Sequence, residues 1–382
     1  IMAQSPGVMI DGASSLDGSL ILFDSDNCFG ADEFGNYSAI TMKWRSGLNK
    51  EGQQHKTADN SDDILWTSVR TYTEDQGTVV FEQYFPTSLG AADVGESSAR
   101  SIFPAFSTAN LGPASDCFAY HEEFPRIISC TLDTYEETPQ GGTPFILYDS
   151  TDKDLPMVVL SPLNSPKAQH MATIDGIIGA GIKATATYIP QGTSQLFVLS
   201  AGMGITKGMD AWGNRLRTVT KRPKTDKYVD VTHSSIGFWT DRGGYYHYST
   251  GDGNGNYVRT YEEILPEVKA YHDSLSVPFR HWQFDSWFYS KDAEVNTAGG
   301  GGAVTNWTSL GEVFPSGMAA IQDKLQIPMV MHNRQWSVVS DYIKNLTYEW
   351  YTCDDPDGVG PAPGPAAVPA DPAAFFTYFF QQ

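Results

Sequence analysis

In three short stretches between residues 235 and 336, an apolar run is followed by polar and aromatic side chains. They are 235–241 (SIGFWTD), 280–287 (RHWQFDSW) and 328–336 (PMVMHNRQW). Carboxylates and a guanidinium can hydrogen-bond ligand hydroxyls, and tryptophan rings offer flat apolar faces, so these residue types suit a small polar ligand. The candidate ligand-binding residues are Trp239, Asp241, Asp285, Trp287, Arg334 and Trp336.

Each charged candidate also has a purely structural interpretation. Asp285 can accept hydrogen bonds from two vicinal hydroxyls while Trp287 stacks on the ring beside them, or it can be satisfied by backbone N–H groups or by Arg280. Asp241 can bind the ligand, or it can be a turn residue paired with Arg242. Both interpretations stay open for each carboxylate.

The third stretch supplies an arginine and a histidine. Arg334 carries a fixed fork of donors that suits a carboxylate or sugar hydroxyls, or it forms an ion pair that orients a carboxylate or holds a loop. His332 has no partner at a diagnostic spacing, so we interpret it as a packed or hydrogen-bonded histidine. Trp336 closes the stretch as Trp239 closes the first one.

Amphipathic helix patterns separate the three stretches. Residues 260–263 (TYEE) fit a capping box, and Ile264, Val268, Tyr271 and Leu275 then recur at helical spacing. Met318, Ile321 and Leu325 mark the next helix, and the four glycines at 299–302 predict a loop over the ligand site. Alternating strands and helices with polar strand ends are typical of a (β/α)8 barrel, whose active sites lie at the carboxyl ends of its strands.

Residues 226–382 are too few for a complete barrel of roughly 250 residues. We therefore expect an incomplete TIM barrel with its first three strand–helix units. Residues 354–372, rich in Pro, Gly and Ala, predict a loop, and 371–376 (DPAAFF) predict a helix start with Pro at its first position.

Residues 1–225 predict an antiparallel β-sandwich domain, followed by the barrel domain at 226–382. Helix-period segments are scarce in this part, and short β-branched or aromatic runs are bounded by turn residues. A basic, Pro-containing segment at 221–227 marks the boundary. The expected strands lie at 19–23, 39–44, 77–84, 182–190 and 194–199.

The composition restricts the partners. The chain has 382 residues and a formal net charge of −20, which argues against nucleic acid or an anionic membrane surface as a partner. No run of 18 apolar residues predicts a membrane span. No phosphate-binding glycine loop, zinc-spaced Cys/His set or nucleophile elbow occurs, so we expect no cofactor and no metal site. Residues 252–263 resemble a calcium loop but carry Tyr257 where that loop needs glycine.

Cysteines and glycosylation sequons bear on the compartment. Cys117 and Cys130 flank a hairpin-like stretch and could be bridged, whereas Cys28 and Cys353 look isolated. Sequons at Asn36, Asn306 and Asn345 are compatible with a secreted, endomembrane or lysosome-like location. The chain begins with Ile1, so we expect that the native start precedes it.

The same stretches resemble the melibiase clan of glycoside hydrolases, in particular its α-galactosidase and raffinose-synthase branch. Residues 237–241 (GFWTD) resemble the first-strand motif Gly-Trp-Cys-Thr-Trp-Asp, and 284–287 (FDSW) resemble the second-strand motif Asp-Asp-Gly-Trp. Residues 314–318 (FPSGM) with 327–332 (IPMVMH) resemble the turn, helix and third strand of that family. Upstream, 189–192 and 202–205 with 212–213 are similar to the end of its sandwich domain.

The resemblance implies a glycoside hydrolase or transglycosidase that acts on α-linked sugars by a retaining mechanism with two carboxylates about 5 Å apart. The family's nucleophile and acid/base lie on strands four and six, so the resemblance places no catalytic residue within these 382 residues. Phe284 replaces the first aspartate of the family's pair, and only Asp285 matches it as a sugar-hydroxyl ligand. The implied partner is an oligosaccharide or glycoside, and the oligomeric state stays open.

Two other functions fit the same residues. One is a non-catalytic carbohydrate-binding or cell-surface protein on the same scaffold, and the other is a structural protein dominated by the sandwich. An aspartate at the end of a fourth barrel strand would separate the enzyme from the binder.

Overall fold

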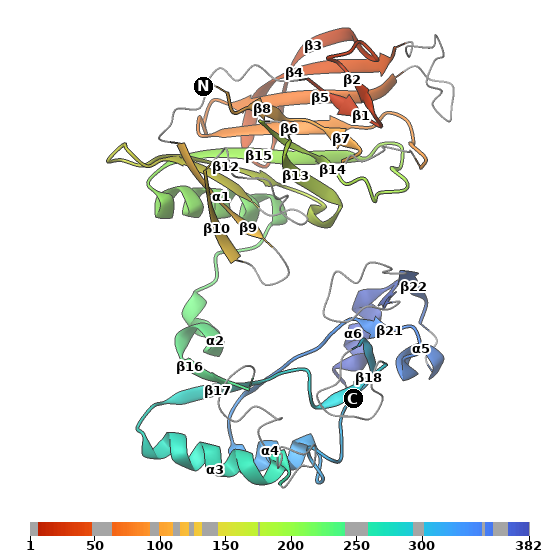
Figure 1. Ribbon diagram of the computed structural model, residues 1–382. Helices are drawn as coiled ribbons and strands as arrows, with labels where there is room; N and C mark the ends of the chain where they lie inside the picture. The colour runs from red at the N-terminus through yellow and green to blue at the C-terminus, as the bar shows by residue number, and fades with distance from the viewer. Residues whose placement is uncertain are drawn as a thin grey trace. The chain divides into compact units, whose positions relative to one another are not determined.

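The computed structural model describes residues 7–47, 63–91, 99–109, 115–121, 126–131, 144–174, 176–240, 259–292, 302–345, 348–353 and 366–381. The chain divides into two compact units, Ile1–Lys224 and Thr225–Gln382, and each is described here by itself (Figure 1). Residues 299–301 of the loop predicted at 299–302 and the candidate Asp241 lie outside the described residues.

A nine-stranded antiparallel sheet dominates the first unit. Its strand order is β10-β9-β11-β12-β15-β6-β5-β4-β3. These strands are β3 (Leu20–Asp32), β4 (Gly35–Ser46), β5 (Asp63–Tyr72), β6 (Thr78–Tyr84), β9 (Ser115–His121), β10 (Arg126–Thr131), β11 (Phe145–Asp149), β12 (Pro156–Pro162) and β15 (Ser194–Met203). The expected strands at 19–23, 39–44, 77–84 and 194–199 all lie in this sheet.

Two three-stranded sheets complete the β structure of the first unit. One is ordered β2-β1-β7 and the other β13-β14-β8. Their strands are β1 (Met9–Ile10), β2 (Ala13–Ser14), β7 (Ser101–Ile102), β8 (Ala105–Ser107), β13 (Gln169–Ile174) and β14 (Ile177–Ile182). The main core joins side chains of these small sheets, such as Ile10 and Ile178, with Leu65, Phe81 and Phe197 of the large sheet. Burial of these alternating apolar side chains is what holds the sheets together.

The strand expected at 182–190 is wrong for most of its length. Strand β14 ends at Ile182, and beyond it only isolated bridges follow, Lys183 with Ala99 and Ile189 with Leu89. Tyr188 is exposed although the alternating pattern matched a half-buried strand. The alternation alone could not show that no neighbouring strand continues alongside this segment.

Helix α1 (Ile205–Thr220) packs against β12 and β15 (Figure 1), and the sequence pattern did not predict it. Two glycines let it approach the sheet: a Cβ on Gly208 would lie 2.2 Å from Met157 Sδ, and one on Gly202 would lie 2.6 Å from Gly208 Cα. The glycines that permit this contact lower the intrinsic helix propensity. The sequence pattern therefore did not indicate a helix here.

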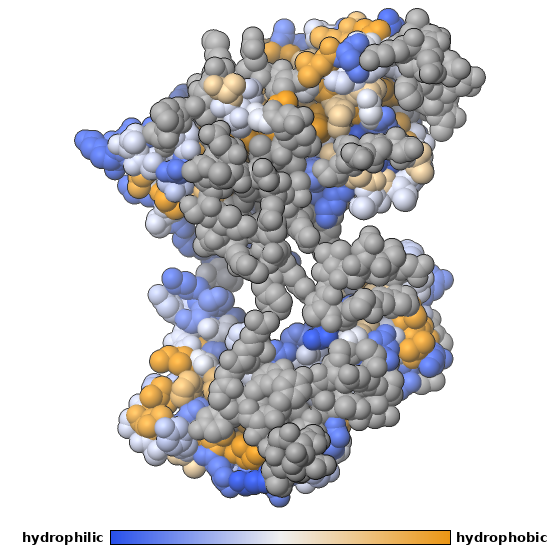
Figure 2. Space-filling view, viewed as in Figure 1, coloured by the Kyte–Doolittle hydropathy of each residue, from blue (hydrophilic) through white to orange (hydrophobic). Residues whose placement is uncertain are grey.

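Cys117 of β9 is disulfide-bonded, and the strand register places Cys130 of β10 directly opposite it. This agrees with the expected pairing of these two cysteines. Cys28 is a free, exposed thiol on β3. Large apolar side chains such as Phe29 are also exposed on β3, an edge strand, and apolar patches gather at the top of the view in Figure 2, where Figure 1 shows β3 and β4.

His170 of β13 should make the stability of the first unit depend on pH. Its side chain is buried, and burial, followed by the charge of Lys183, lowers its pKa from 6.5 to about 4. Between these two values the unfolded chain binds the proton that the folded chain rejects, so the free energy of unfolding falls as the pH falls. The loss at pH 4 is about 3 kcal/mol. In urea unfolding, we expect the wild type to lose more stability than His170→Gln when the pH falls from 7 to 4. A difference between the two proteins that does not depend on pH would contradict this.

The second unit begins with the 3-10 turn η2 (Lys227–Val229), helix α2 (Val231–Ser234) and a parallel sheet. The sheet is ordered β16 (Ile236–Trp239), β17 (Phe279–Phe284) and β20 (Met329–Met331), and both pairings are parallel. Helices α3 (Tyr261–Ser274) and α4 (Met318–Leu325) lie between successive strands in the chain and contact each other (Figure 1). The three strands follow the predicted order, while an incomplete barrel stays a prediction.

The two helices match their sequence signals to different degrees. The Thr260 side chain accepts from Glu263 N and the Glu263 carboxylate accepts from Thr260 N, so the capping box is present. The predicted apolar stripe on α3 is confirmed in its first half, where Val268 is buried and Ile264 packs against the core, and is wrong in its second half, where Tyr271 and Leu275 are about half exposed. On α4, Ile321 and Leu325 are buried as expected.

A second, mixed sheet was not expected from the sequence. It is ordered β18 (Tyr289–Lys291), β19 (Val304–Ser309), β21 (Trp336–Ser337), β23 (Ala366–Pro369) and β22 (Trp350–Cys353). Strand β23 replaces the end of the loop predicted at 354–372. Helix α5 (Asp341–Asn345) follows β21, and α6 (Pro372–Phe379) begins at the predicted N-cap, where Asp371 accepts from Ala374 N.

Candidate functional site

Three polar residues directly follow the three parallel strands of the second unit. Thr240 follows β16, Asp285 follows β17, and His332 follows β20. The register pairs Trp239 with Gln283 and Phe284 with Met331, so the three strands end at the same edge of the sheet. We name this group the strand-end cluster, and it consists of Thr240, Asp285, Ser286, Tyr289, His332 and Arg334.

Thr240 joins the first two strands at this edge. It is fully buried, and its Oγ1 lies 3.2 Å from Asp285 N and 3.2 Å from the indole nitrogen of Trp287, both of which donate to it. Its own backbone N–H donates to Gln283 O at 3.1 Å. Thr240 therefore fixes the backbone that carries Asp285.

Asp285 and Arg334 both hydrogen-bond to Ser286, the residue that follows Asp285. Asp285 is half-buried, and its Oδ1 accepts from the backbone N–H of Ser286. Arg334 donates through Nη2 to Ser286 Oγ at 3.0 Å. Within the described part of the chain, Arg334 forms no ion pair, and its buried Nη1 has no hydrogen-bond partner. A buried donor without a partner costs about 1–3 kcal/mol, which a ligand oxygen could recover.

Tyr289 and His332 form the other side of the cluster. The Tyr289 hydroxyl and His332 Nδ1 share a hydrogen bond of 2.9 Å, and the two rings are nearly parallel, at 12°. The backbone of His332 is fixed as well, because its N–H donates to Phe284 O and its carbonyl accepts from Trp307 Nε1. This agrees with the interpretation of His332 as a hydrogen-bonded histidine.

The charges of the cluster act on one another. Burial raises the pKa of the Tyr289 hydroxyl above its usual range; the positive charge of Arg334 opposes this rise and the negative charge of Asp285 adds to it. Both charges therefore reach the same hydroxyl. The phenol stays protonated at neutral pH, so Tyr289 can donate or accept a hydrogen bond but does not act as a base.

Tyr289 and Lys291 were missed by sequence reasoning. Lys291 is fully buried, its Nζ donates to Ser286 O, and it lies 4.7 Å from the centre of the Tyr289 ring. Both residues lie on β18, four and six positions after Asp285, in a region interpreted as a connection. The unexpected strand β18 is what brings Tyr289 into the cluster and Lys291 into contact with it.

The predicted tryptophans have different surroundings. Trp239 is 46% exposed at the end of β16, whereas Trp287 is 0% and Trp336 is 3% exposed. Trp287 packs against Tyr261, with ring centres 4.5 Å apart, and Trp336 packs against residues of α5 and α6. The prediction that Trp287 and Trp336 stack on a ligand is therefore corrected: both are core residues. Asp241 lies outside the described residues.

In the described ranges, no three His, Cys, Asp or Glu side chains lie together in a way that could hold a metal ion. The stretch at 252–256 that resembles a calcium loop lies outside those ranges, and the Glu263 carboxylate is bound to Thr260 N. In the same described part, no helix is both long and apolar enough to span a membrane.

The comparisons with known proteins find similarity among solved structures. No family model matches the chain, and no curated protein matches it. Among solved structures, the chain is similar to the alpha-N-acetylgalactosaminidase NagBb from Bifidobacterium bifidum in its Gal-NHAc-DNJ complex, with 11% sequence identity and a TM-score of 0.49. The alignment covers 89% of this chain and 55% of that one, so this chain spans about half the length of that structure. A likeness of this degree does not by itself assign an activity.

Proposed function

We propose that the strand-end cluster binds the terminal ring of an α-linked saccharide in a glycoside hydrolase or transglycosidase of the α-galactosidase and raffinose-synthase type. The observation that carries the proposal is the meeting of Asp285 and Arg334 around Ser286 at the shared end of three parallel strands, with Arg334 Nη1 buried and unpartnered among the described residues. A carboxylate and a guanidinium fork together can hold neighbouring hydroxyls of one ring.

Each residue has a defined part in this proposal. Asp285 accepts hydrogen bonds from ring hydroxyls, and Arg334 donates to a ring oxygen or hydroxyl from Nη1. Trp239, the one predicted tryptophan with an open face among the described candidates, lies one residue before Thr240 and offers its ring to the sugar. Neither carboxylate of a retaining mechanism is assigned to the cluster, whose residues select and hold the ligand in this proposal.

Binding to methyl α-galactoside and methyl α-glucoside tests the proposal. In Arg334→Met or Asp285→Asn we expect affinity to fall about ten- to hundredfold, because a hydrogen bond to a charged group is lost. Arg259→Met is the matched control, because Arg259 lies in the same unit and forms an exposed pair with Glu267. The measurement is titration calorimetry together with the indole NMR signal of Trp239 in protein labelled with ¹⁵N-tryptophan.

Two results would contradict the proposal. Equal affinities in Arg334→Met and Arg259→Met would show that Arg334 does not bind the saccharide. A Trp239 signal that no saccharide changes would show that the cluster is not a saccharide site. We expect no turnover of p-nitrophenyl α-galactoside by these 382 residues. Turnover would show that a working carboxylate pair lies within them.

A further inference from the structure

A pocket of about 320 Å³ opens on the nine-stranded sheet of the first unit. It lies on the face of the sheet that α1 covers further along. Tyr72, Val80 and Val198 of that face pack against side chains of α1. Because every second residue of a strand faces the same side, the pairing of the strands places the pocket residues on this same face, beyond the part that α1 covers. The pocket is lined there by Asp26, Cys28, Thr41, Lys43, Trp66, Ser68, Glu82 and Tyr84.

Two aromatic rings lie side by side in this pocket. Trp66 of β5 and Tyr84 of β6 are paired in register, with ring centres 5.2 Å apart and an interplanar angle of 39°. Both are half-buried, and Trp66 Nε1 donates to Asp63 Oδ2 at 3.3 Å, which restrains the ring. The rings lie on the face opposite the main core and line the pocket, where Lys43 Nζ lies 5.5 Å from the centre of the Trp66 ring.

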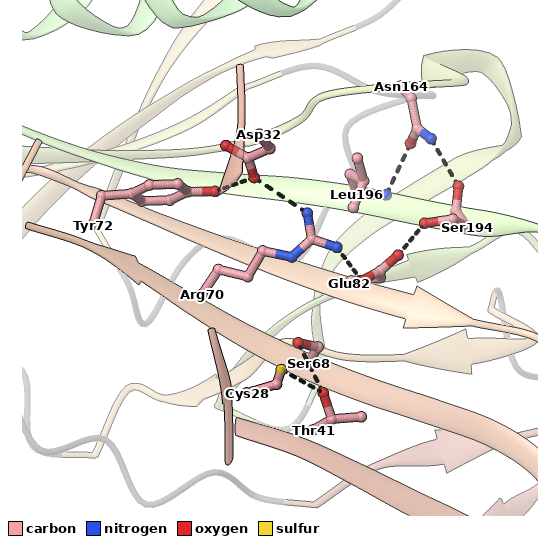
Figure 3. Close-up of polar contacts among 10 residues, drawn as sticks. All are labelled: Cys28, Asp32, Thr41, Ser68, Arg70, Tyr72, Glu82, Asn164, Ser194 and Leu196. Carbon is pink, nitrogen blue, oxygen red and sulfur yellow. Dashed lines mark hydrogen bonds and ion pairs between the residues drawn. The ribbon is translucent and has the colours of Figure 1, made fainter. Parts of the chain in front are cut away.

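Charged side chains around the rings are already paired with one another. Lys43 Nζ lies 2.7 Å from Asp24 and 2.9 Å from Asp26, and hydrogen bonds to these two carboxylates raise the pKa of Lys43. Arg70 likewise contacts both Asp32 and Glu82 (Figure 3). Four carboxylates surround two cations, so the region keeps a negative excess. An anionic ligand such as a phosphate ester would therefore be repelled.

Small hydroxyl-bearing residues form the rest of the wall. Thr41 donates to Ser68 Oγ at 3.4 Å, and Cys28 Sγ lies 3.8 Å from Thr41 Oγ1 (Figure 3). Glu82 is held from both sides, by Arg70 and by the Ser194 hydroxyl, so its carboxylate has a fixed position. Fixed carboxylates and hydroxyls beside two rings suit a neutral ligand that carries both hydroxyls and an apolar face.

We propose that this pocket is a second saccharide-binding site, in which a neutral pyranose lays its C–H face on Trp66 and Tyr84 and directs hydroxyls to Asp26 and Glu82. The site belongs to the first unit and needs no residue of the strand-end cluster.

The test uses the full chain labelled with ¹⁵N-tryptophan and titrated with methyl α-galactoside, methyl α-glucoside, methyl β-glucoside and maltotriose. We expect a saturable shift of the Trp66 indole signal, which is identified by its absence in Trp66→Ala. The free thiol of Cys28 gives an independent readout, because an occupied pocket should slow its alkylation at the peptide that contains it. Glycerol serves as the hydroxyl-only control and choline as the cation control.

Variants separate this site from the proposed function. Tyr84→Ala should weaken binding about tenfold or more through loss of one stacking face, whereas Tyr84→Phe keeps the ring and should bind nearly as wild type. Trp239→Ala and Arg334→Met in the second unit should leave the Trp66 response unchanged. Each of the two sites can therefore fail without the other.

Several outcomes would overturn the proposal. They are a Trp66 signal and a Cys28 alkylation rate that no saccharide changes, a response to choline but not to saccharides, and a saccharide response that survives in Tyr84→Ala. Circular dichroism of each variant establishes that it is folded, and the Tyr84→Phe variant covers the case in which Tyr84→Ala does not fold.

Discussion

Replacing Trp287 by alanine is expected to lower the free energy of unfolding of the second unit by about 3–5 kcal/mol. The indole is fully buried among Tyr261, Phe284, Phe288 and Phe314, with ring centres between 4.5 and 6.0 Å away. Its Nε1 also donates to Thr240 Oγ1, so the variant loses a buried hydrogen bond in addition to leaving a cavity. The strand end that carries Asp285 should loosen with it.

Trp239→Ala is the matched control for this prediction. It removes the same side chain from a site that is 46% exposed, one residue before Thr240, so its effect on stability should be small. Urea unfolding gives the free energies, and hydrogen exchange measured peptide by peptide assigns the loss to residues 279–292. Equal losses in the two variants would show that Trp287 is not the core residue that its packing indicates.

Local signals in the sequence predicted local structure well. The capping box of α3 and the N-cap of α6 depend on hydrogen bonds within a few residues, so spacing alone revealed Thr260 with Glu263 and Asp371 with Pro372. The order of the three parallel strands also followed from the alternation of apolar runs and helix patterns. These features need no information about distant partners.

The sequence did not predict the features that depend on partners distant in the chain. The sequence did not predict helix α1, because Gly208, which permits the close contact with Met157 of β12, also lowers helix propensity. The burial of Trp287 and Trp336 was hidden because a tryptophan at a strand end can face a ligand or the core, and only the neighbouring rings decide.

The candidate site shows the same division. Asp285 and Arg334 were chosen because polar residues at the ends of consecutive strands meet when those strands are parallel, and both contact Ser286. Tyr289 and Lys291 reach the cluster only because β18 pairs with β19, a partner with no local signal. The pocket of the first unit was missed for a related reason: Trp66 and Tyr84 lie in different strands and meet only through the register of β5 and β6.

Asp11→Asn should lower the free energy of unfolding of the first unit by about 3 kcal/mol, the low end of the range for breaking a buried ion pair, because Asp11 keeps some contact with solvent. The Arg100 side chain is 0% exposed and that of Asp11 is 22% exposed. Arg100 donates to both carboxylate oxygens of Asp11 at 2.8 Å and to the carbonyls of Ala186 and Gly90. Asparagine keeps the shape and tolerates the left-handed backbone of Asp11, at φ 46°, so the change removes mainly the charge.

A double-mutant cycle separates the pair from its surroundings. Arg100→Met removes the buried cation, so adding Asp11→Asn to it should cost much less than Asp11→Asn alone, and the coupling should appear in urea midpoints. Asp24→Asn, which breaks the exposed pair with Lys43, should leave the midpoint nearly unchanged. A small loss in Asp11→Asn would mean that the carbonyls of Ala186 and Gly90 alone suffice to hold the guanidinium. A large loss would show that the pairing of β1 with β7 depends on this ion pair to stabilise the contact between segments 89 residues apart.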